Sequence, residues 1–325
     1  MVSEAQYFLG RGISLEEQLN RIPHEQTWTD LNPELSISDS PFAPQSQGFR
    51  FDGTDTQRAI AQVSLEGYLM SRPGLIPAGL CQALARAVER IQAEGFHPLY
   101  IGVYDEYWQV LHGIQPYLEG ILGPDCYPVG DFWTWFISSK TANAGWAPHR
   151  DLQFKTQTLR QDGRPTIVTV WLPFTDATPL NGCMYLVPMN LDPNLPDHPE
   201  RYGLSMQNIR ALPASAGTLL AWNQYVFHWG SRCSPFADGP RISTGIYYQS
   251  ADVAPFVGKR VHFERPLNFE TRLAYIASNV LNYHQYHNYP DEILSMCFRH
   301  IRSLANYEQL VPSDLYPKMP LDCDR

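Results

Sequence analysis

Between about residues 130 and 250, short apolar runs alternate with turn-forming residues. Five runs in this region are rich in β-branched and aromatic residues: DFWTWFISS, PTIVTVWLPF, CMYLVP, GTLLAWN and RISTGIYYQ. Clusters of Gly, Pro, Asn and Asp separate them, and this pattern is typical of short strands joined by turns. Many short strands of this kind predict a β-sandwich or a closed antiparallel barrel.

Helical spacing of apolar residues flanks this β region on both sides. Residues 80–91 and 108–122 predict two helices before it, and residues 268–310 predict two more after it. We therefore expect a mainly β fold with flanking helices. A polar N-terminal arm is expected over residues 1–60, followed by a single domain over residues 61–325.

Charge and cysteine content narrow the functional class. The net charge is −9 without any run of Lys and Arg, which argues against binding to nucleic acid or anionic lipid. The chain lacks an apolar run approaching the roughly 20 residues that span a bilayer, and its start does not have the pattern of a secretory leader. Six scattered cysteines without a C-x-x-C pair predict reduced thiols. We expect a cytoplasmic protein that acts on a small-molecule substrate.

A histidine followed two residues later by an acid occurs three times. Ten histidines and 33 acidic residues among 325 positions predict about one such triplet by chance. His198 begins a triplet in a proline-rich loop, and His262 begins one that is followed by a predicted helix. His149 and Asp151 instead lie in WAPHRDLQF, an extended segment in which alternate residues project to one face. This last triplet is therefore the candidate metal site.

A third ligand is expected from a distant segment that the fold brings alongside. AWNQYVFHWG supplies His228, and two imidazoles with one carboxylate are typical of non-haem Fe(II) oxygenases. Such enzymes need an electron donor, commonly 2-oxoglutarate, whose far carboxylate suits a bidentate arginine. Arg241 follows thirteen residues after His228, and Ser243 shares its strand face.

These motifs together resemble the phytanoyl-CoA dioxygenase family of Fe(II)/2-oxoglutarate-dependent oxygenases. The likeness covers about residues 130–250 and is carried by the His149–Asp151 pair and three longer blocks: TVWLPFTDATPLNGCMYLVPMN, AGTLLAWNQYVFHWGSRCSP and PRISTGIYYQ. It implies a double-stranded β-helix core (a cupin-like jelly roll) over about the same residues. N- and C-terminal helices would pack on one of its sheets, with a helical extension at about residues 268–310.

The resemblance also implies a role for each matched residue. The iron ligands would be His149, Asp151 and His228, and the 2-oxoglutarate contacts would be Arg241, Ser243 and Trp171. Dioxygen would be the third reactant. The family often has Gly-Ser-His after the proline of LVPMNLDPNLPD, which this chain lacks, so no substrate contact is carried over from that region. Related halogenases have a small residue in the place of Asp151, so its carboxylate favours hydroxylation.

We therefore expect a dioxygenase that hydroxylates an unactivated C–H bond of a small metabolite or sugar-like substrate, releasing succinate and CO2. Two alternatives are a catalytically silent jelly-roll metal-binding protein and a cupin-like metal enzyme that does not use 2-oxoglutarate. Arg241 argues against the first, because a structural metal site does not need it. Five tryptophans surround the site in sequence, and at least half are expected to be core: Trp133, Trp135, Trp146, Trp222 and Trp229. Neither the identity of the substrate nor the oligomeric state is predicted.

Overall fold

The computed structural model describes residues 13–40, 49, 53–140, 144–151, 159–201, 203–255, 260–287 and 289–304. Its helices are α2 (Leu15–Arg21), α3 (Glu25–Leu31), α4 (Gly53–Glu66), α5 (Ala78–Ala93), α6 (Asp105–Leu122), α7 (Phe269–Tyr283) and α8 (Asp291–Ser303), with short 3-10 turns η1 (Pro98–Val103), η2 (Met189–Leu191), η3 (Met206–Asn208) and η4 (His284–Tyr286). Its strands are β1 (Tyr68–Met70), β2 (Tyr127–Ile137), β3 (Ile167–Pro173), β4 (Met184–Val187), β5 (Arg210–Leu212), β6 (Leu220–Trp222), β7 (Phe227–Gly230) and β8 (Arg241–Gln249). Among the described residues, no helix has both the length and the apolar character needed to cross a membrane.

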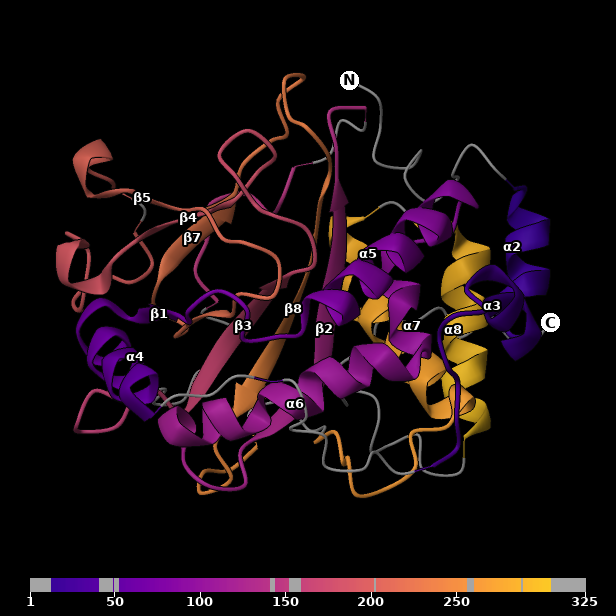
Figure 1. Cartoon of the computed structure of the whole chain (residues 1–325), viewed down its shortest axis with the longest axis horizontal. Helices are drawn as coiled ribbons and strands as arrows, with labels where there is room; N and C mark the ends of the chain where they lie inside the picture. The colour runs from indigo at the N-terminus through magenta and orange to yellow at the C-terminus, as the bar shows by residue number, and fades with distance from the viewer. Residues whose placement is uncertain are drawn as a thin grey trace.

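The strands form two antiparallel sheets. The larger has five strands in the order β1-β6-β3-β8-β2, and the smaller has three in the order β5-β4-β7. Figure 1 shows the smaller sheet on one side of the larger one and most of the helices on the other side. The molecule therefore has a helical layer, a central sheet and a second, smaller sheet.

The alternation of side chains along the central strands connects these layers. On β3, Val168, Val170 and Leu172 belong to the large hydrophobic cluster shared with the helices. Trp171 belongs instead to a second cluster, which contains residues of the smaller sheet such as Leu186. Because neighbouring strand residues point to opposite faces, one face of the central sheet is covered by helices and the other faces the space between the sheets.

The predicted elements are largely present. Each of the five predicted strand segments contains a strand, and the predicted helices correspond to α5, α6, α7 and α8. The sequence did not reveal β1, β5 and β7, which have only three or four residues each. The description "mainly β" is not confirmed, since more of the chain is helical than extended. The strands are mostly short, whereas the helices are long enough to cover a whole face of the sheet.

Part of the predicted N-terminal arm is packed against the rest of the molecule. Helix α3 carries Trp28, which is fully buried and stacks on Tyr100 of η1 with ring centroids 4.8 Å apart. The Trp28 indole N–H donates to the carbonyl of Ile22, and the hydroxyl of Tyr104 donates to the carbonyl of Trp28. The division of the chain at residue 60 remains a prediction; α4 spans that position.

Candidate metal centre

The two histidines of the predicted site lie directly opposite each other in the backbone. His149 and His228 form an isolated antiparallel bridge, in which each backbone N–H donates to the other residue's carbonyl at 3.1 and 3.0 Å. Opposite residues of an antiparallel pair project to the same face, and the two ring centroids are 4.4 Å apart. The sequence predicted an extended segment around His149. In the described residues, this segment pairs with β7 through a single bridge, the one between His149 and His228.

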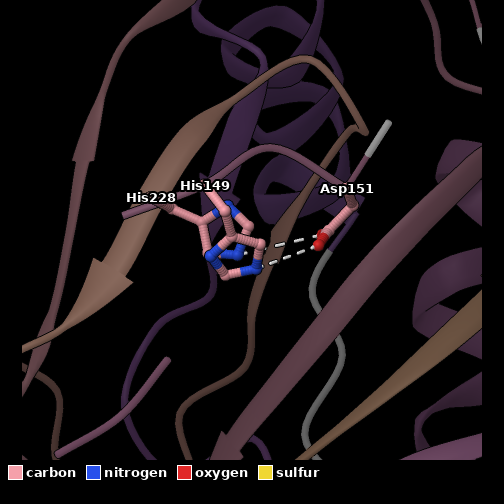
Figure 2. A group of neighbouring side chains, drawn as sticks. All are labelled: His149, Asp151 and His228. Carbon is pink, nitrogen blue, oxygen red and sulfur yellow. Dashed lines mark ion pairs between the residues drawn. The ribbon is translucent and has the colours of Figure 1, made fainter. Parts of the chain in front are cut away.

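Asp151 completes a group of three ligand atoms. Its Oδ1 lies 3.3 Å from Nε2 of His149, and its Oδ2 lies 3.8 Å from Nε2 of His228. All three ligand atoms lie within 4.8 Å of one another, and no other such group of His, Cys, Asp or Glu occurs in the described part of the chain. Figure 2 shows both imidazoles turned toward the Asp151 carboxylate. The three ligand atoms are close enough for a single metal ion to bind all of them, in place of the direct contacts between Asp151 and the two histidines.

Backbone carbonyls orient both imidazole rings. Nδ1 of His149 lies 2.7 Å from the carbonyl of Ala147, and Nδ1 of His228 lies 3.0 Å from the carbonyl of Val226. A carbonyl oxygen can only accept, so Nδ1 is the protonated nitrogen in both rings. The Nε2 lone pairs therefore point toward the centre of the group, as a metal ligand requires.

Two donors on neighbouring strands hold the aspartate. Oδ2 of Asp151 accepts from the hydroxyl of Thr169 at 2.6 Å and from the indole N–H of Trp222 at 3.1 Å. Thr169 on β3 and Trp222 on β6 are paired across the central sheet, so their side chains reach the carboxylate from the same face. The sequence analysis missed the role of both residues, because it follows from strand register rather than from spacing.

The charges of the three groups suit a metal ligand set. Burial disfavours ionisation of Asp151, but its attraction to His228 and its hydrogen bond with His149 outweigh burial and hold the pKa of the carboxyl well below its usual range. Burial lowers the pKa of His228 to about 4, so this imidazole is neutral near pH 7. Burial also opposes charge on His149, but the hydrogen bond with Asp151 raises its pKa. A metal ion would compete with a proton mainly at His149.

Arg150 points away from the site, as the alternation of an extended segment predicts. Its Nη2 donates to Oδ2 of Asp192 at 2.7 Å, and both side chains are completely buried. Its Nη1 donates to the carbonyl of Tyr225, and its guanidinium lies 5.3 Å from the ring centroid of Phe227. This buried pair ties the segment that carries His149 to β7 and to the loop after η2. No signal in the sequence identified Asp192.

Arg241 and Ser243 lie next to each other on β8, on the face that the sequence predicted. Arg241 is only 1% exposed and donates from Nη1 to the hydroxyl of Ser243 at 3.2 Å. Its guanidinium lies 5.6 Å from the ring centroid of Trp171 and 5.9 Å from that of Trp135. A Cβ added at Gly145 would lie 2.8 Å from the Cα of Gly230, so the absence of a side chain at Gly145 allows these two backbone segments to approach each other beside Arg241.

A small pocket of about 70 Å³ connects these groups. It is lined by the three candidate ligands, by Arg241 and Trp171, and by all five tryptophans that surround the site in sequence: Trp133, Trp135, Trp146, Trp222 and Trp229. Among the described residues, the buried indole N–H of Trp171 has no hydrogen-bond partner. A second pocket shares the wall formed by Trp133, Trp146 and His149, and residues of α7 and η4 also line it.

The pocket contains one more carboxylate, Asp131 of β2, which the sequence analysis did not single out. It is 8% exposed and is not among the three clustered ligands. The site therefore combines a compact His-Asp-His group, a buried arginine with a serine, and a second buried acid, all within aromatic walls.

Comparisons with known proteins agree with this arrangement. Residues 104–234 match the sequence model of the phytanoyl-CoA dioxygenase (PhyH) family, which confirms the resemblance seen in the sequence. No curated protein sequence matches this chain.

Several solved structures resemble this chain at low sequence identity. The ligand-free non-haem monooxygenase ThoJ is 14% identical with a TM-score of 0.52, and the alignment covers 76% of this chain and 100% of that one. The α-ketoglutarate-dependent epimerase SnoN from nogalamycin biosynthesis is 21% identical with a TM-score of 0.48, covering 67% and 96%. HygX from Streptomyces hygroscopicus, with nickel and 2-oxoglutarate bound, is 12% identical with a TM-score of 0.46, covering 61% and 88%. The likeness to ThoJ supports a common fold.

Proposed function

We propose that this chain, which carries a phytanoyl-CoA dioxygenase family match, is a non-haem Fe(II)/2-oxoglutarate-dependent oxygenase. Within this class we propose that it hydroxylates an unactivated C–H bond of a small metabolite or sugar-like substrate. The observation that carries the proposal is the convergence of His149, Asp151 and His228 at the wall of an aromatic pocket. Two imidazoles and one carboxylate leave several coordination positions open for the co-substrate and for dioxygen.

The residues around the triad fit a metal ion. Both Nε2 atoms face inward because Nδ1 of each ring is fixed by a backbone carbonyl, and Oδ1 of Asp151 is left for the metal because Thr169 and Trp222 engage Oδ2. Bound iron, with 2-oxoglutarate and dioxygen, would supply the oxidising chemistry, in which 2-oxoglutarate becomes succinate and CO2. The chain itself contributes ligand orientation and a buried, largely aromatic pocket that limits access of water.

The co-substrate would lie between the metal and β8. Arg241 supplies a planar guanidinium that matches a carboxylate in two hydrogen bonds, and Ser243 fixes one of its nitrogens. The buried N–H of Trp171 offers a further donor on the same side of the pocket. We propose that these three residues bind the far carboxylate of 2-oxoglutarate.

Asp151 supports hydroxylation over halogenation. A carboxylate fills the position that must be small for a halide to bind the metal, and the hydrogen bonds from Thr169 and Trp222 fix it there. We also propose that the two sheets are the halves of a double-stranded β-helix. The widely spaced cysteines, which are free among the described residues, support a cytoplasmic location.

The deciding experiment follows 2-oxoglutarate binding and turnover in the wild type and in Arg241→Ala. Under anaerobic conditions, Fe(II) and 2-oxoglutarate should produce the visible absorption of their chelate on the wild-type protein, and exposure to air should yield succinate. Arg241→Ala should weaken 2-oxoglutarate binding by about tenfold or more, because charge-assisted hydrogen bonds are lost, while metal binding is retained. Arg164→Ala, in which an exposed arginine paired with Asp162 is removed, is the matched control and should behave as wild type.

Two other results would indicate one of the two alternative functions given above. Metal binding without any 2-oxoglutarate binding would indicate a cupin-like metal enzyme that does not use this co-substrate. Binding of both, with no succinate formed in air even over long incubation, would indicate a catalytically silent protein. Either result would contradict the proposed function.

A further inference from the structure

A buried arginine lies between two of the candidate metal ligands. Arg150 is the chain neighbour of both His149 and Asp151, and the alternation of an extended segment turns its side chain to the opposite face. His149 is itself bridged to His228 of β7. Contacts that fix the side chain of Arg150 therefore also fix the backbone from which two of the three ligands project.

The guanidinium of Arg150 also contacts the chain that leads to the third ligand, His228. Its Nη1 donates to the carbonyl of Tyr225, and its central carbon lies 5.3 Å from the ring centroid of Phe227. Tyr225 and Phe227 precede His228 by three positions and by one position. One side chain therefore connects the backbone positions of all three ligands.

Asp192 holds the other end of the guanidinium. Its Oδ2 accepts from Nη2 of Arg150 at 2.7 Å, and neither side chain has any exposed surface. Its Oδ1 accepts from the backbone N–H of Asn194 at 2.9 Å and from the side-chain amide of Asn194 at 3.2 Å. That amide also donates to the carbonyl of Gly203 at 2.8 Å. The Asp192 carboxylate is thus fixed by its own loop, which follows η2, and it gives Arg150 a partner in a defined place.

The energetics of a buried ion pair favour a positioning role over a stabilising one. Removing two charges from water costs about as much free energy as their attraction returns, and apolar side chains often replace such a pair without loss of stability. A charged pair, however, is satisfied only when its hydrogen bonds are well aligned. The pair formed by Arg150 and Asp192 therefore supplies a fixed geometry, and it does so beside three groups whose mutual distances decide metal affinity.

We propose that Arg150 and Asp192 are positioning residues for the metal centre. They hold His149, Asp151 and His228 in the arrangement that a metal ion requires before the ion binds, and they connect that arrangement to the loop after η2. Both act through the ligands. The inference deepens the proposed function and rests on it, because it takes the triad to be the metal site.

Replacement of both charges separates positioning from stability. Arg150→Met combined with Asp192→Asn leaves no uncompensated charge, and the substituted side chain at position 192 keeps an acceptor for the N–H of Asn194. Zn(II) is titrated by calorimetry under conditions in which the variant is folded. We expect Zn(II) to bind about tenfold more weakly than to the wild type. The visible absorption of bound Co(II), which depends on ligand geometry, should also change.

A second buried ion pair provides the matched control. Arg272 of α7 donates from Nη1 to the carbonyl of Val103 at 2.8 Å, and its Nη2 lies 2.6 Å from Oδ1 of Asp105, which also accepts from the backbone N–H of Ser38. Arg272→Met combined with Asp105→Asn therefore removes the same kinds of contact, at residues that do not line the pocket. We expect this control to be destabilised to a comparable extent, while its Zn(II) affinity and Co(II) absorption remain those of the wild type.

A measurement on the wild type needs no variant. If the ion pair couples the ligands to the loop after η2, Zn(II) binding must in return stabilise that loop. Amide hydrogen exchange should therefore slow at residues 189–201 when Zn(II) binds, whereas exchange in α2, at residues 15–21, should not change.

The outcomes separate this inference from the proposed function. Equal Zn(II) affinities of the wild type and the folded Arg150→Met/Asp192→Asn variant would overturn the inference, and so would an equal loss of affinity in both double variants. If the first double variant does not fold, hydrogen exchange decides, and unchanged exchange at residues 189–201 would overturn the inference. Failure of the wild type to bind Zn(II) at all would instead overturn the proposed function.

Discussion

At the scale of single residues, spacing in the sequence identified the candidate ligands but not the groups that orient them. His149, Asp151, His228 and Arg241 could be predicted because alternation along an extended segment and the order of the motifs are visible in the sequence. Thr169 could not, since it reaches Asp151 only because β3 pairs with β6 in one particular register. Strand register is decided by packing of the whole sheet, which the residue order does not display.

The hydrogen bond from Thr169 to Asp151 is expected to tune metal affinity. Thr169→Val keeps the shape of the side chain but removes the donor at 2.6 Å from Oδ2. Loss of one such outer partner typically weakens metal binding by about 10- to 100-fold, and we expect a value near the lower end because Trp222 still donates. Titration of the protein with Zn(II), followed by calorimetry, measures the effect.

A second threonine provides the control for that experiment. Thr175 donates to the carbonyl of Pro240 at 3.0 Å and accepts from the backbone N–H of Ile242, and it does not line the pocket. Thr175→Val should lower stability but leave the affinity for Zn(II) unchanged. Equal affinities for the wild type and Thr169→Val would show that the aspartate needs no support from β3.

At the scale of elements, the longest predictions were the most accurate. The run RISTGIYYQ coincides with β8, and the apolar spacing around residues 80–91 and 108–122 correctly indicated α5 and α6. Strand β7, with four residues, is too short for a periodic pattern, although it carries His228. In β2, three residues between Pro128 and Phe132 stand opposite a single residue of β8, and this bulge was also not predictable, because its support comes from α7, about 150 residues later in the chain.

The bulge should depend on Asn279. Asn279→Ala removes the acceptor for the N–H of Phe132 and the donor to the carbonyl of Gly130. Leaving buried backbone groups without partners costs about 1–3 kcal/mol each, so we expect the free energy of unfolding to fall by roughly 2–4 kcal/mol. Urea denaturation measures it. Asn282→Ala, one helical turn further and less buried, is the control and should cost clearly less; equal losses would indicate that Asn279 has no special role.

The free energy of unfolding should decrease in acid, because two buried histidines packed against Trp133 become protonated when the chain unfolds. The ring centroids of His97 and His287 lie 4.9 and 4.8 Å from that of Trp133. Burial lowers the pKa of His287 to about 4 and that of His97 well below its ordinary value. The unfolded chain binds these protons near pH 6.5, so the stabilisation is complete above that value and decreases as the pH falls toward 4.

His287→Phe isolates one of these protons. The variant keeps an aromatic ring against Trp133 but cannot titrate, so the loss of stability between pH 7 and pH 5 should be smaller than in the wild type by about 2 kcal/mol. Urea denaturation at both pH values gives this difference directly. At pH 8, residue 287 is uncharged in the wild type and in the variant, in both the folded and the unfolded state. A difference in stability at this pH therefore measures the change in packing alone. Identical pH dependence in the two proteins would contradict the assignment.

At the scale of the whole molecule, the site depends on all three layers. The triad draws on a bridge beside the smaller sheet, its supporting donors come from the central sheet, and Asp131 is held by the helical layer. The large hydrophobic cluster continues from the N-terminal helices through α5 and α6 to the central sheet and α7. Local composition predicted a polar arm at the N-terminus, because the few apolar side chains that anchor this segment are widely spaced in the sequence.

Trp28 tests whether that N-terminal segment belongs to the same cooperative unit. Trp28→Ala removes a completely buried ring that stacks on Tyr100 and lies 5.0 Å from Phe96, and such a change typically costs about 3–5 kcal/mol. If the cluster unfolds as one, helix content and Zn(II) binding should be lost together, at a lower urea concentration than in the wild type. Leu65→Ala, at a position 64% exposed on α4, should change stability by less than about 0.5 kcal/mol. An early loss of helix in Trp28→Ala, with Zn(II) binding preserved to the wild-type midpoint, would show instead that the arm unfolds independently of the metal centre.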